Sequence, residues 1–113
     1  MSNNLDLFIE KAAGVYTIYA DGRLDSSTTD FFGSFCEEKV DDNCEKVLLN
    51  FEKLEFLSSA GLRNIIMLTR KLSESNVAIY GVQPAVEDVL NVCGFAVFLK
   101  IEKTAEEALA AIS

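Results

Sequence analysis

Two adjacent serines, Ser58 and Ser59, are the side chains of this sequence best placed to do chemistry. They come just before the apolar stripe of an amphipathic helix, which we expect at about 60–74. A serine at such a position can accept a hydrogen bond from an unpaired helix N–H and cap the helix. It can also be phosphorylated, because the free N–H donors and the positive dipole end of a helix tolerate a phosphate group. A phosphate would add about −1.5 to −2 charge and would act on a partner at the docking surface.

The composition argues against a catalytic role for these serines. The 113 residues include no histidine, which excludes Ser-His-Asp and Cys-His arrangements and histidine-based metal sites. The sequence holds no G-x-S-x-G elbow, P-loop or G-x-G-x-x-G motif. The lysines nearest to the serine pair along the chain are Lys53 and Lys71, and nothing in the sequence brings either one close to it. We therefore expect a protein that is not an enzyme and that has no cofactor and no metal site.

The charge limits the partners. Ten basic and 18 acidic residues give a net charge of −8, so we expect no general attraction for nucleic acid or anionic lipid. Part of the acidity lies between Glu37 and Glu45, which indicates either a solvated helix end and loop or a docking face for a basic partner. Three cysteines without a CxxC pair indicate a reducing compartment, in which Cys36 and Cys93 act as small apolar residues. Because there is also no signal-peptide pattern and no apolar run of membrane-spanning length, we expect a cytoplasmic protein without membrane insertion.

Strand and helix signals alternate around the serine pair. Segments with alternating or continuous apolar residues predict five strands, at 5–11, 15–20, 46–51, 77–82 and 97–101. Turns are expected at Ala13-Gly14 and at Asp21-Gly22. A helix at about 27–40 follows Asp25, Ser26 and Ser27, which are all favoured N-cap types. A later helix begins at Pro84 and ends at Gly94. Thr104, with Glu107 three residues on, has the spacing of a capping box and predicts a last helix.

The predicted order is β-β-α-β-α-β-α-β-α. Strands that alternate with helices favour parallel pairing, whereas the first two strands are expected to form a hairpin. The sequence therefore predicts one α/β domain over residues 1–113, with a mixed, mostly parallel sheet of about five strands covered by about four helices.

The segment FLSSAGLRNI resembles the signature of STAS domains, the anti-sigma factor antagonists of bacterial partner-switching systems. The resemblance covers almost the whole chain and includes the opening hairpin, the Gly22-Arg23-Leu24-Asp25 turn and the segment KVLLNFEKLEFLSSAGL. It implies that Ser59, two residues before Gly61, is the phosphorylation target. The founding members of the family often have aspartate at the position before the target. This sequence has Ser58 there, which leaves two adjacent hydroxyls and makes Ser58 a second, less favoured acceptor.

The resemblance also implies partners, because family members are not enzymes. They bind a serine kinase that is also an anti-sigma factor, they are phosphorylated by it, and a serine phosphatase resets them. When Ser59 is unphosphorylated, the chain is expected to bind this kinase and so release a sigma factor. The expected contact residues are the loop and the exposed face of the following helix: Asp25, Ser58, Ser59, Ala60, Gly61, Arg63, Asn64 and Met67. Asp25 has a simpler interpretation as a helix N-cap, and the three helical positions as a solvated face.

Three alternatives stay open. The chain could be a STAS subunit that is not phosphorylated, in a lipid-transport complex of the bacterial envelope or in a stress-signalling assembly. It could be a small nucleotide-binding or serine-dependent enzyme on a flavodoxin-like sheet, which would need a large pocket and a base near Ser58 or Ser59. It could also be an interaction module in which Ser59 only caps the helix.

Overall fold

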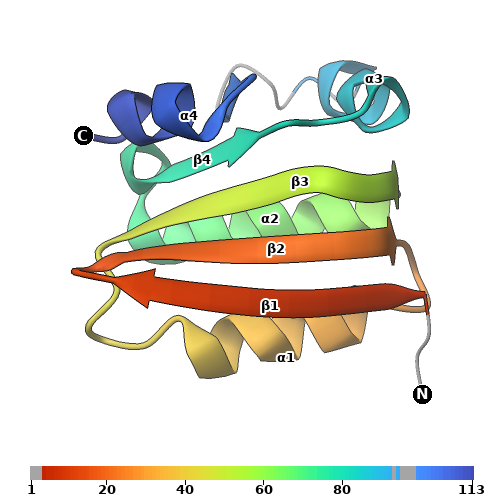
Figure 1. Ribbon diagram of the computed structural model, residues 1–113. Helices are drawn as coiled ribbons and strands as arrows, with labels where there is room; N and C mark the ends of the chain where they lie inside the picture. Colours follow the sequence, from red (N-terminus) through yellow and green to blue (C-terminus); the bar gives the residue numbers. More distant parts are fainter. Residues whose placement is uncertain (1–3, 93, 95–98) are drawn as a thin grey trace.

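A five-stranded sheet forms the centre of the computed structural model, which describes residues 4–92, 94 and 99–113 (Figure 1). The strands lie in the order β1-β2-β3-β4-β5, with β1 antiparallel to β2 and the other neighbours parallel. Their bounds are Leu5–Ala12 (β1), Val15–Leu24 (β2), Lys46–Leu57 (β3), Val77–Tyr80 (β4) and Lys100–Glu102 (β5). The expected mixed, mostly parallel sheet with an N-terminal hairpin is confirmed.

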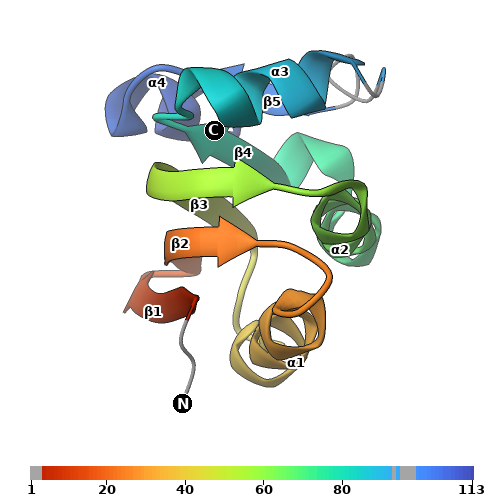
Figure 2. The same cartoon turned by 90° about the vertical axis from the view of Figure 1, so that its right-hand side faces the viewer.

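Four α-helices accompany the sheet in the described part of the chain. Their bounds are Thr29–Lys39 (α1), Ser59–Leu72 (α2), Pro84–Val92 (α3) and Ala105–Ala111 (α4). Figure 2 shows α1 and α2 side by side on one face of the strands β1, β2 and β3. The helix α4 packs on the opposite face, where Ala108 and Ile112 lie against Leu48, Ala78 and Tyr80. Val86 and Leu90 of α3 join the core on the side of α1 and α2, whereas α4 covers only part of the opposite face.

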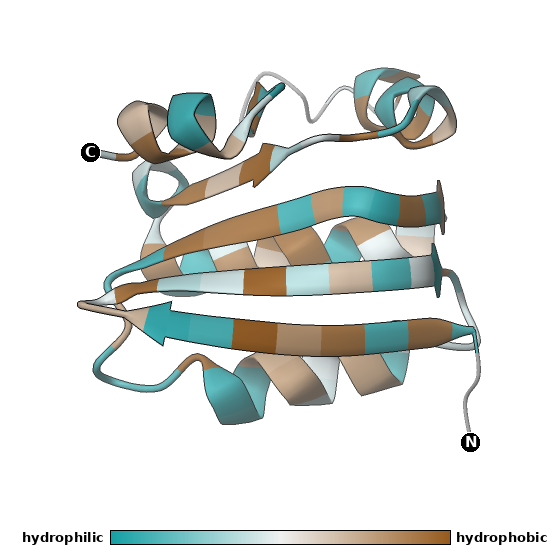
Figure 3. Cartoon of the chain, viewed as in Figure 1, coloured by the Kyte–Doolittle hydropathy of each residue, from teal (hydrophilic) through white to brown (hydrophobic). Residues whose placement is uncertain are grey.

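The hydrophobic pattern explains which strands are central. All four residues of β4 are buried, and the first half of β3 is a nearly continuous apolar run (Figure 3). In β1, Leu5, Leu7 and Ile9 face the main core, whereas Asp6, Phe8 and Glu10 between and after them are exposed. Cys36 and Cys44 are free and buried, and burial raises the pKa of the Cys36 thiol to about 12. Cys36 therefore behaves as the expected apolar residue, whereas Cys93 lies outside the described residues.

One of the two predicted turns is confirmed and the other is wrong. Ala13 and Gly14 both have positive φ (50° and 86°), which fits a two-residue hairpin loop of type I′ between the paired residues Ala12 and Val15. The strand β2 does not turn at Asp21-Gly22 but continues to Leu24 with shifts in its register against β3. A Cβ atom at Gly22 would lie 2.2 Å from the Asn4 carbonyl oxygen, so this glycine permits a close backbone approach.

The element boundaries shift at several other points. The helix α1 begins after Thr28, two residues later than predicted, and β3 runs to Leu57, six residues beyond the predicted end at 51. The helix α2 ends at Leu72 because Ser73 adopts a φ of 79°. The Thr104 hydroxyl accepts a hydrogen bond from the Glu107 N–H at 3.2 Å, which confirms the predicted cap of α4. The predicted strand at 97–101 falls partly outside the described residues, and β5 begins at residue 100.

Part of the acidic stretch after α1 is held by the hairpin. The Tyr16 hydroxyl donates a hydrogen bond to Asp41 Oδ1 at 2.7 Å, and Lys11 Nζ lies 3.3 Å from Asp41 Oδ2. The hydrogen bond from Tyr16 lowers the pKa of Asp41 and raises the pKa of Tyr16 to about 12. Asp41 is therefore an ionised anchor between the loop and the sheet rather than a free surface charge.

Replacing Tyr16 by phenylalanine should remove a pH-dependent part of the stability. Because folding lowers the pKa of Asp41 from its ordinary 3.8, the contribution is present above that value and is lost as the pH falls through the lowered one. We expect Tyr16→Phe to be less stable than the parent at neutral pH and the difference to shrink in acid. Urea unfolding across this range measures it, with Asp42→Asn as the control. A difference that is constant with pH would contradict the expectation.

Candidate functional site

Two loops lie next to each other where β2 and β3 end. Leu24 and Leu57 are the last paired residues of these parallel strands, and the Ser58 N–H donates to the Leu24 carbonyl at 2.9 Å. Asp25 and Ser58, which directly follow the two strands, thus begin neighbouring loops at the carboxyl edge of the sheet. This is the edge at which functional residues of α/β sheets gather.

The two serines have different roles. Ser58 is the N-cap of α2, with extended φ and ψ of −94° and 169°, and its Oγ accepts a hydrogen bond from the Gly61 N–H at 3.1 Å. Ser59 is the first helical residue, it is exposed, and its hydroxyl makes no hydrogen bond with any other described residue. The interpretation of Ser59 as the helix cap is therefore wrong, because that function belongs to Ser58.

Gly61 explains why the helix begins where it does. A Cβ atom at this buried position would lie 2.6 Å from Leu24 Cγ, 2.9 Å from the Leu24 carbonyl oxygen and 3.0 Å from Leu57 Cδ1. The first turn of α2 thus packs directly on the ends of β2 and β3. Of the expected contact residues, Gly61 is therefore buried against the strand ends, and Ala60 is half-buried.

Asp25 is not the N-cap of α1, contrary to the simpler interpretation. Its Oδ1 accepts hydrogen bonds from the N–H (2.9 Å) and the hydroxyl (2.7 Å) of Ser27, and its Oδ2 lies 3.4 Å from Arg23 Nε. The Ser27 hydroxyl contributes most to lowering the pKa of Asp25, and the Ser27 N–H and Arg23 add to it. Asp25 is thus an ionised carboxylate that shapes the loop between β2 and α1. The N-cap position is Thr28, whose side chain makes no capping bond.

The structure adds two residues that we did not single out as contact residues. The Arg23 guanidinium lies over the Phe56 ring, 4.3 Å from its centroid. Because this pair joins the end of β2 to the end of β3, it places a cation and an aromatic ring beside both loops. One signal could have suggested part of it: Arg23 and Asp25, two residues apart at a strand end, can share a face.

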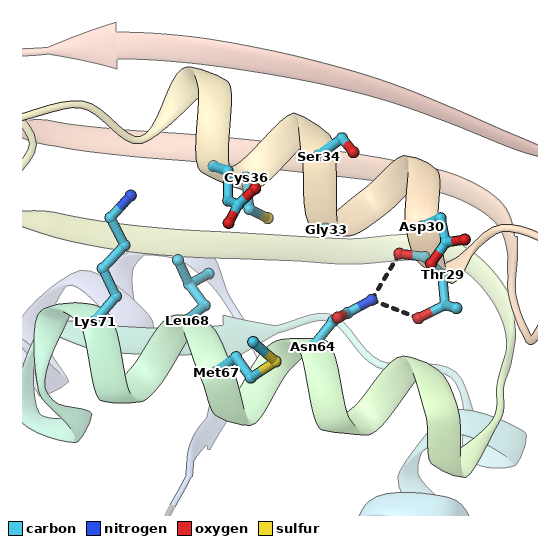
Figure 4. Close-up of a pocket in the computed structure, with 10 residues that line it drawn as sticks. Thr29, Asp30, Gly33, Ser34, Cys36, Asn64, Met67, Leu68 and Lys71 are labelled. Atoms are coloured by element: carbon cyan, nitrogen blue, oxygen red, sulfur yellow. Dashed lines mark hydrogen bonds between the residues drawn. The ribbon is translucent and has the colours of Figure 1, made fainter.

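Asn64 joins the two helices instead of facing solvent as expected. Its Nδ2 donates to the Thr29 carbonyl at 2.7 Å and also bonds to the Thr29 hydroxyl (Figure 4). The Thr29 hydroxyl in turn donates to the Ala60 carbonyl at 3.3 Å. Asn64 is therefore half-buried, whereas Arg63 and Met67 are exposed as expected, Met67 by 58%.

A groove of about 650 Å³ runs between α1 and α2. Met67, Leu68 and Cys36 line it together with the carboxylates of Asp30 and Glu37. At the far end of α2 from the serines, Lys71 Nζ donates to the Val40 carbonyl at 2.9 Å, so this lysine is not beside Ser59. Among the described residues, the groove brings no base to the serine hydroxyls.

The described residues contain no group of three or more His, Cys, Asp and Glu side chains that could hold a metal ion. Among the same residues, none of the helices has the length and apolar character needed to cross a membrane.

The fold and the site define a small α/β domain whose β3–α2 loop presents an exposed serine at the start of a helix. The model of the STAS domain family matches residues 7–108, and the chain belongs to this family.

Relatives carry a consistent description. The candidate anti-sigma factor antagonist BtrV of Bordetella bronchiseptica is 24% identical over 109 residues, which cover 95% of this chain and 94% of the relative. The anti-sigma F factor antagonist of Paenibacillus polymyxa is 27% identical over 109 residues, covering 94% and 93%. The crystal structure of an anti-sigma factor antagonist from Mycobacterium paratuberculosis matches with a TM-score of 0.86 at 21% identity, covering 96% and 93%. These likenesses agree with the STAS fold.

Substituting Gly61 by alanine should destabilise the protein although alanine is the better helix former. The added Cβ atom would overlap Leu24, and overpacking of this kind costs about 1–3 kcal/mol. Gly33→Ala in α1 is the matched control, because its Cβ would find its nearest neighbour at 3.5 Å, an ordinary contact. We expect the control to be neutral or more stable by up to about 1 kcal/mol. Chemical denaturation measures both, and equal effects would contradict the steric explanation.

Alanine substitutions should distinguish the structural role of Ser58 from that of Ser59 by their effects on stability. Ser58→Ala removes the cap of α2 and should cost about 1 kcal/mol of unfolding free energy. Ser59→Ala removes an exposed hydroxyl and should change the stability by less than about 0.5 kcal/mol. Thermal and urea unfolding of both variants test this. The assignment fails if the Ser59 variant is the less stable of the two.

Proposed function

We propose that this chain is an anti-sigma factor antagonist that phosphorylation of Ser59 switches off. In its unphosphorylated form it binds a serine kinase that is also an anti-sigma factor, and the sigma factor is released. A serine phosphatase restores the binding form. The names of the relatives from Bordetella and Paenibacillus support the general role.

The division of roles between the serines is the observation that carries the proposal. Ser58 already uses its hydroxyl to hold the Gly61 N–H, so modifying it would disturb the start of α2. The Ser59 hydroxyl is exposed and performs no such function among the described residues. A kinase can therefore reach it without unfolding the helix, which makes Ser59 the preferred acceptor.

The modification itself is a phosphoryl transfer. A bond forms between Ser59 Oγ and the γ-phosphorus of ATP while the bond from that phosphorus to ADP breaks, and the hydroxyl proton passes to a base of the kinase. The product adds about −1.5 to −2 charge at the first residue of α2. The positive end of the helix dipole favours a negative charge there, so the domain keeps its fold.

The phosphate then acts on the partner rather than on the domain. The proposed docking surface consists of Asp25 in the loop after β2, Ser58 after β3, and the exposed side chains of Ser59, Arg63 and Met67 on α2. Asn64 contributes by holding α1 beside this surface. New negative charge at the contact costs up to several kcal/mol when it meets like charge or loses water, enough to dissociate the complex.

Mimicking each state of Ser59 should separate binding from release. We expect Ser59→Ala to bind the kinase/anti-sigma factor of the native host as tightly as the unphosphorylated parent, and Ser59→Asp to bind at least about tenfold more weakly. Calorimetry with the purified pair measures both affinities. Ser75→Asp adds the same charge on an exposed position after α2 and should leave binding unchanged. Equal affinity of the two Ser59 variants would contradict the switch.

Intact-mass analysis with fragment mapping of the protein from its host, in growth and in stress, tests the modification directly. A single phosphate on Ser59 that varies with the condition supports the proposal. Its absence in all conditions would instead favour a STAS subunit that is not phosphorylated, in a lipid-transport or stress-signalling complex. The proteins that co-purify would then distinguish these two.

A further inference from the structure

Part of the sheet is uncovered on the side opposite α1 and α2. The helix α4 covers Leu48, Ala78 and Tyr80, and no described element lies over the remaining part of that face on β1, β2 and the second half of β3 (Figure 2). We call this region the open face and define it by the outward residues Asp6, Phe8, Glu10, Tyr19, Asp21, Asn50 and Glu52. It lies on the opposite side of the sheet from α2 and from the docking surface proposed above.

Aromatic side chains form the centre of the open face. The strand register pairs Phe8 with Tyr19 and Tyr19 with Asn50 in one row across the sheet. Phe8 is 64% exposed, although it lies in the middle of a strand. Phe8, Tyr19 and Asn50 line a hollow of about 270 Å³ together with Asp21 and Glu52. This volume is slightly below the roughly 300 Å³ of the smallest drug-sized pockets, and it suits one inserted side chain.

Acidic groups surround this aromatic centre. The open face holds the carboxylates of Asp6, Glu10, Asp21 and Glu52, and the hollow adds a single ammonium group, from Lys53. Asp6 and Asp21 are directly opposite each other on β1 and β2, and like charges at such a cross-strand pair are destabilising. The ammonium group of Lys53, which is paired with Asp21 in the register of β2 and β3, offsets only part of this negative charge.

We propose that the open face docks a basic segment of a partner protein, with a lysine or arginine side chain inserted in the hollow. The Phe8 and Tyr19 rings would hold the cation through their π faces, and the carboxylates of Asp21 and Glu52 would pair with it. A second copy of this chain is disfavoured because each copy carries a net charge of −8 and would bring the same acidic face. Charge complementarity therefore selects a basic partner.

A synthetic peptide of alternating lysine and leucine is the probe, and its mirror in charge, alternating glutamate and leucine, is the negative control. We expect the lysine peptide alone to bind the full chain and to shift NMR amide resonances of β1, β2 and the second half of β3. Phe8→Ala and Glu52→Gln should each weaken it by about tenfold, the range of a central contact. Added salt should weaken it further.

Matched variants distinguish a specific site from general attraction to an acidic protein. Phe31→Ala removes an aromatic ring that is 49% exposed on α1, and Glu55→Gln removes one exposed β3 carboxylate outside the hollow. Both should leave the affinity unchanged. Glu52→Gln tests the site independently if Phe8→Ala lowers the stability.

Any of the following results of the peptide experiments would overturn the inference: no binding of the lysine peptide, shifts centred on the acidic stretch 37–45, or equal losses in the test and control variants. Sedimentation that shows a dimer lost on Phe8→Ala would also overturn it, since the occupant would then be a second copy. Ser59→Asp should leave peptide binding unchanged. A failure here is thus separate from a failure of the phosphorylation switch.

Discussion

The contact of Gly61 with Leu24 is the constraint on which the site depends. The paired ends of β2 and β3 leave no space for a Cβ atom at the third residue of α2. This fixes where the helix begins and makes Ser58 its cap, with Ser59 directed outward. A start shifted by one residue would exchange the roles of the two serines. The division between a structural and a modifiable hydroxyl is therefore a consequence of backbone packing.

The position of α2 in turn determines the surface around it. Asn64 bonds to Thr29 near one end of α1, and Lys71 bonds to the Val40 carbonyl at the other. These contacts join α2 to both ends of α1, and the groove between the helices has exposed side chains such as Met67 along it. The open face lies on the opposite side of the sheet, so the domain has room for two partners of different chemistry.

Local signals made most of the fold predictable. The glycine of the hairpin turn, the Thr104 cap and the apolar runs of the central strands each act within a few residues, and the structure confirms them. The errors concern glycines and charges whose function is not local. Gly22 resembles a turn residue but permits the approach of Asn4, and the charged second half of β3 stays a strand because it pairs with β2.

The sequence by itself determined the order of the elements, the acidity, and a serine pair at the start of an amphipathic helix. Tertiary structure decided which of the two serines caps that helix. The two side chains are identical and adjacent, so the end of β3 at Leu57 determines that Ser58 takes the N-cap position. It also turned Asn64 toward Thr29 of the facing helix. The path of the loop after β2 brought Ser27 and Arg23 to the Asp25 carboxylate. The open face exists because α4 covers only part of that side of the sheet. The periodicity within one segment does not predict which other elements will cover it.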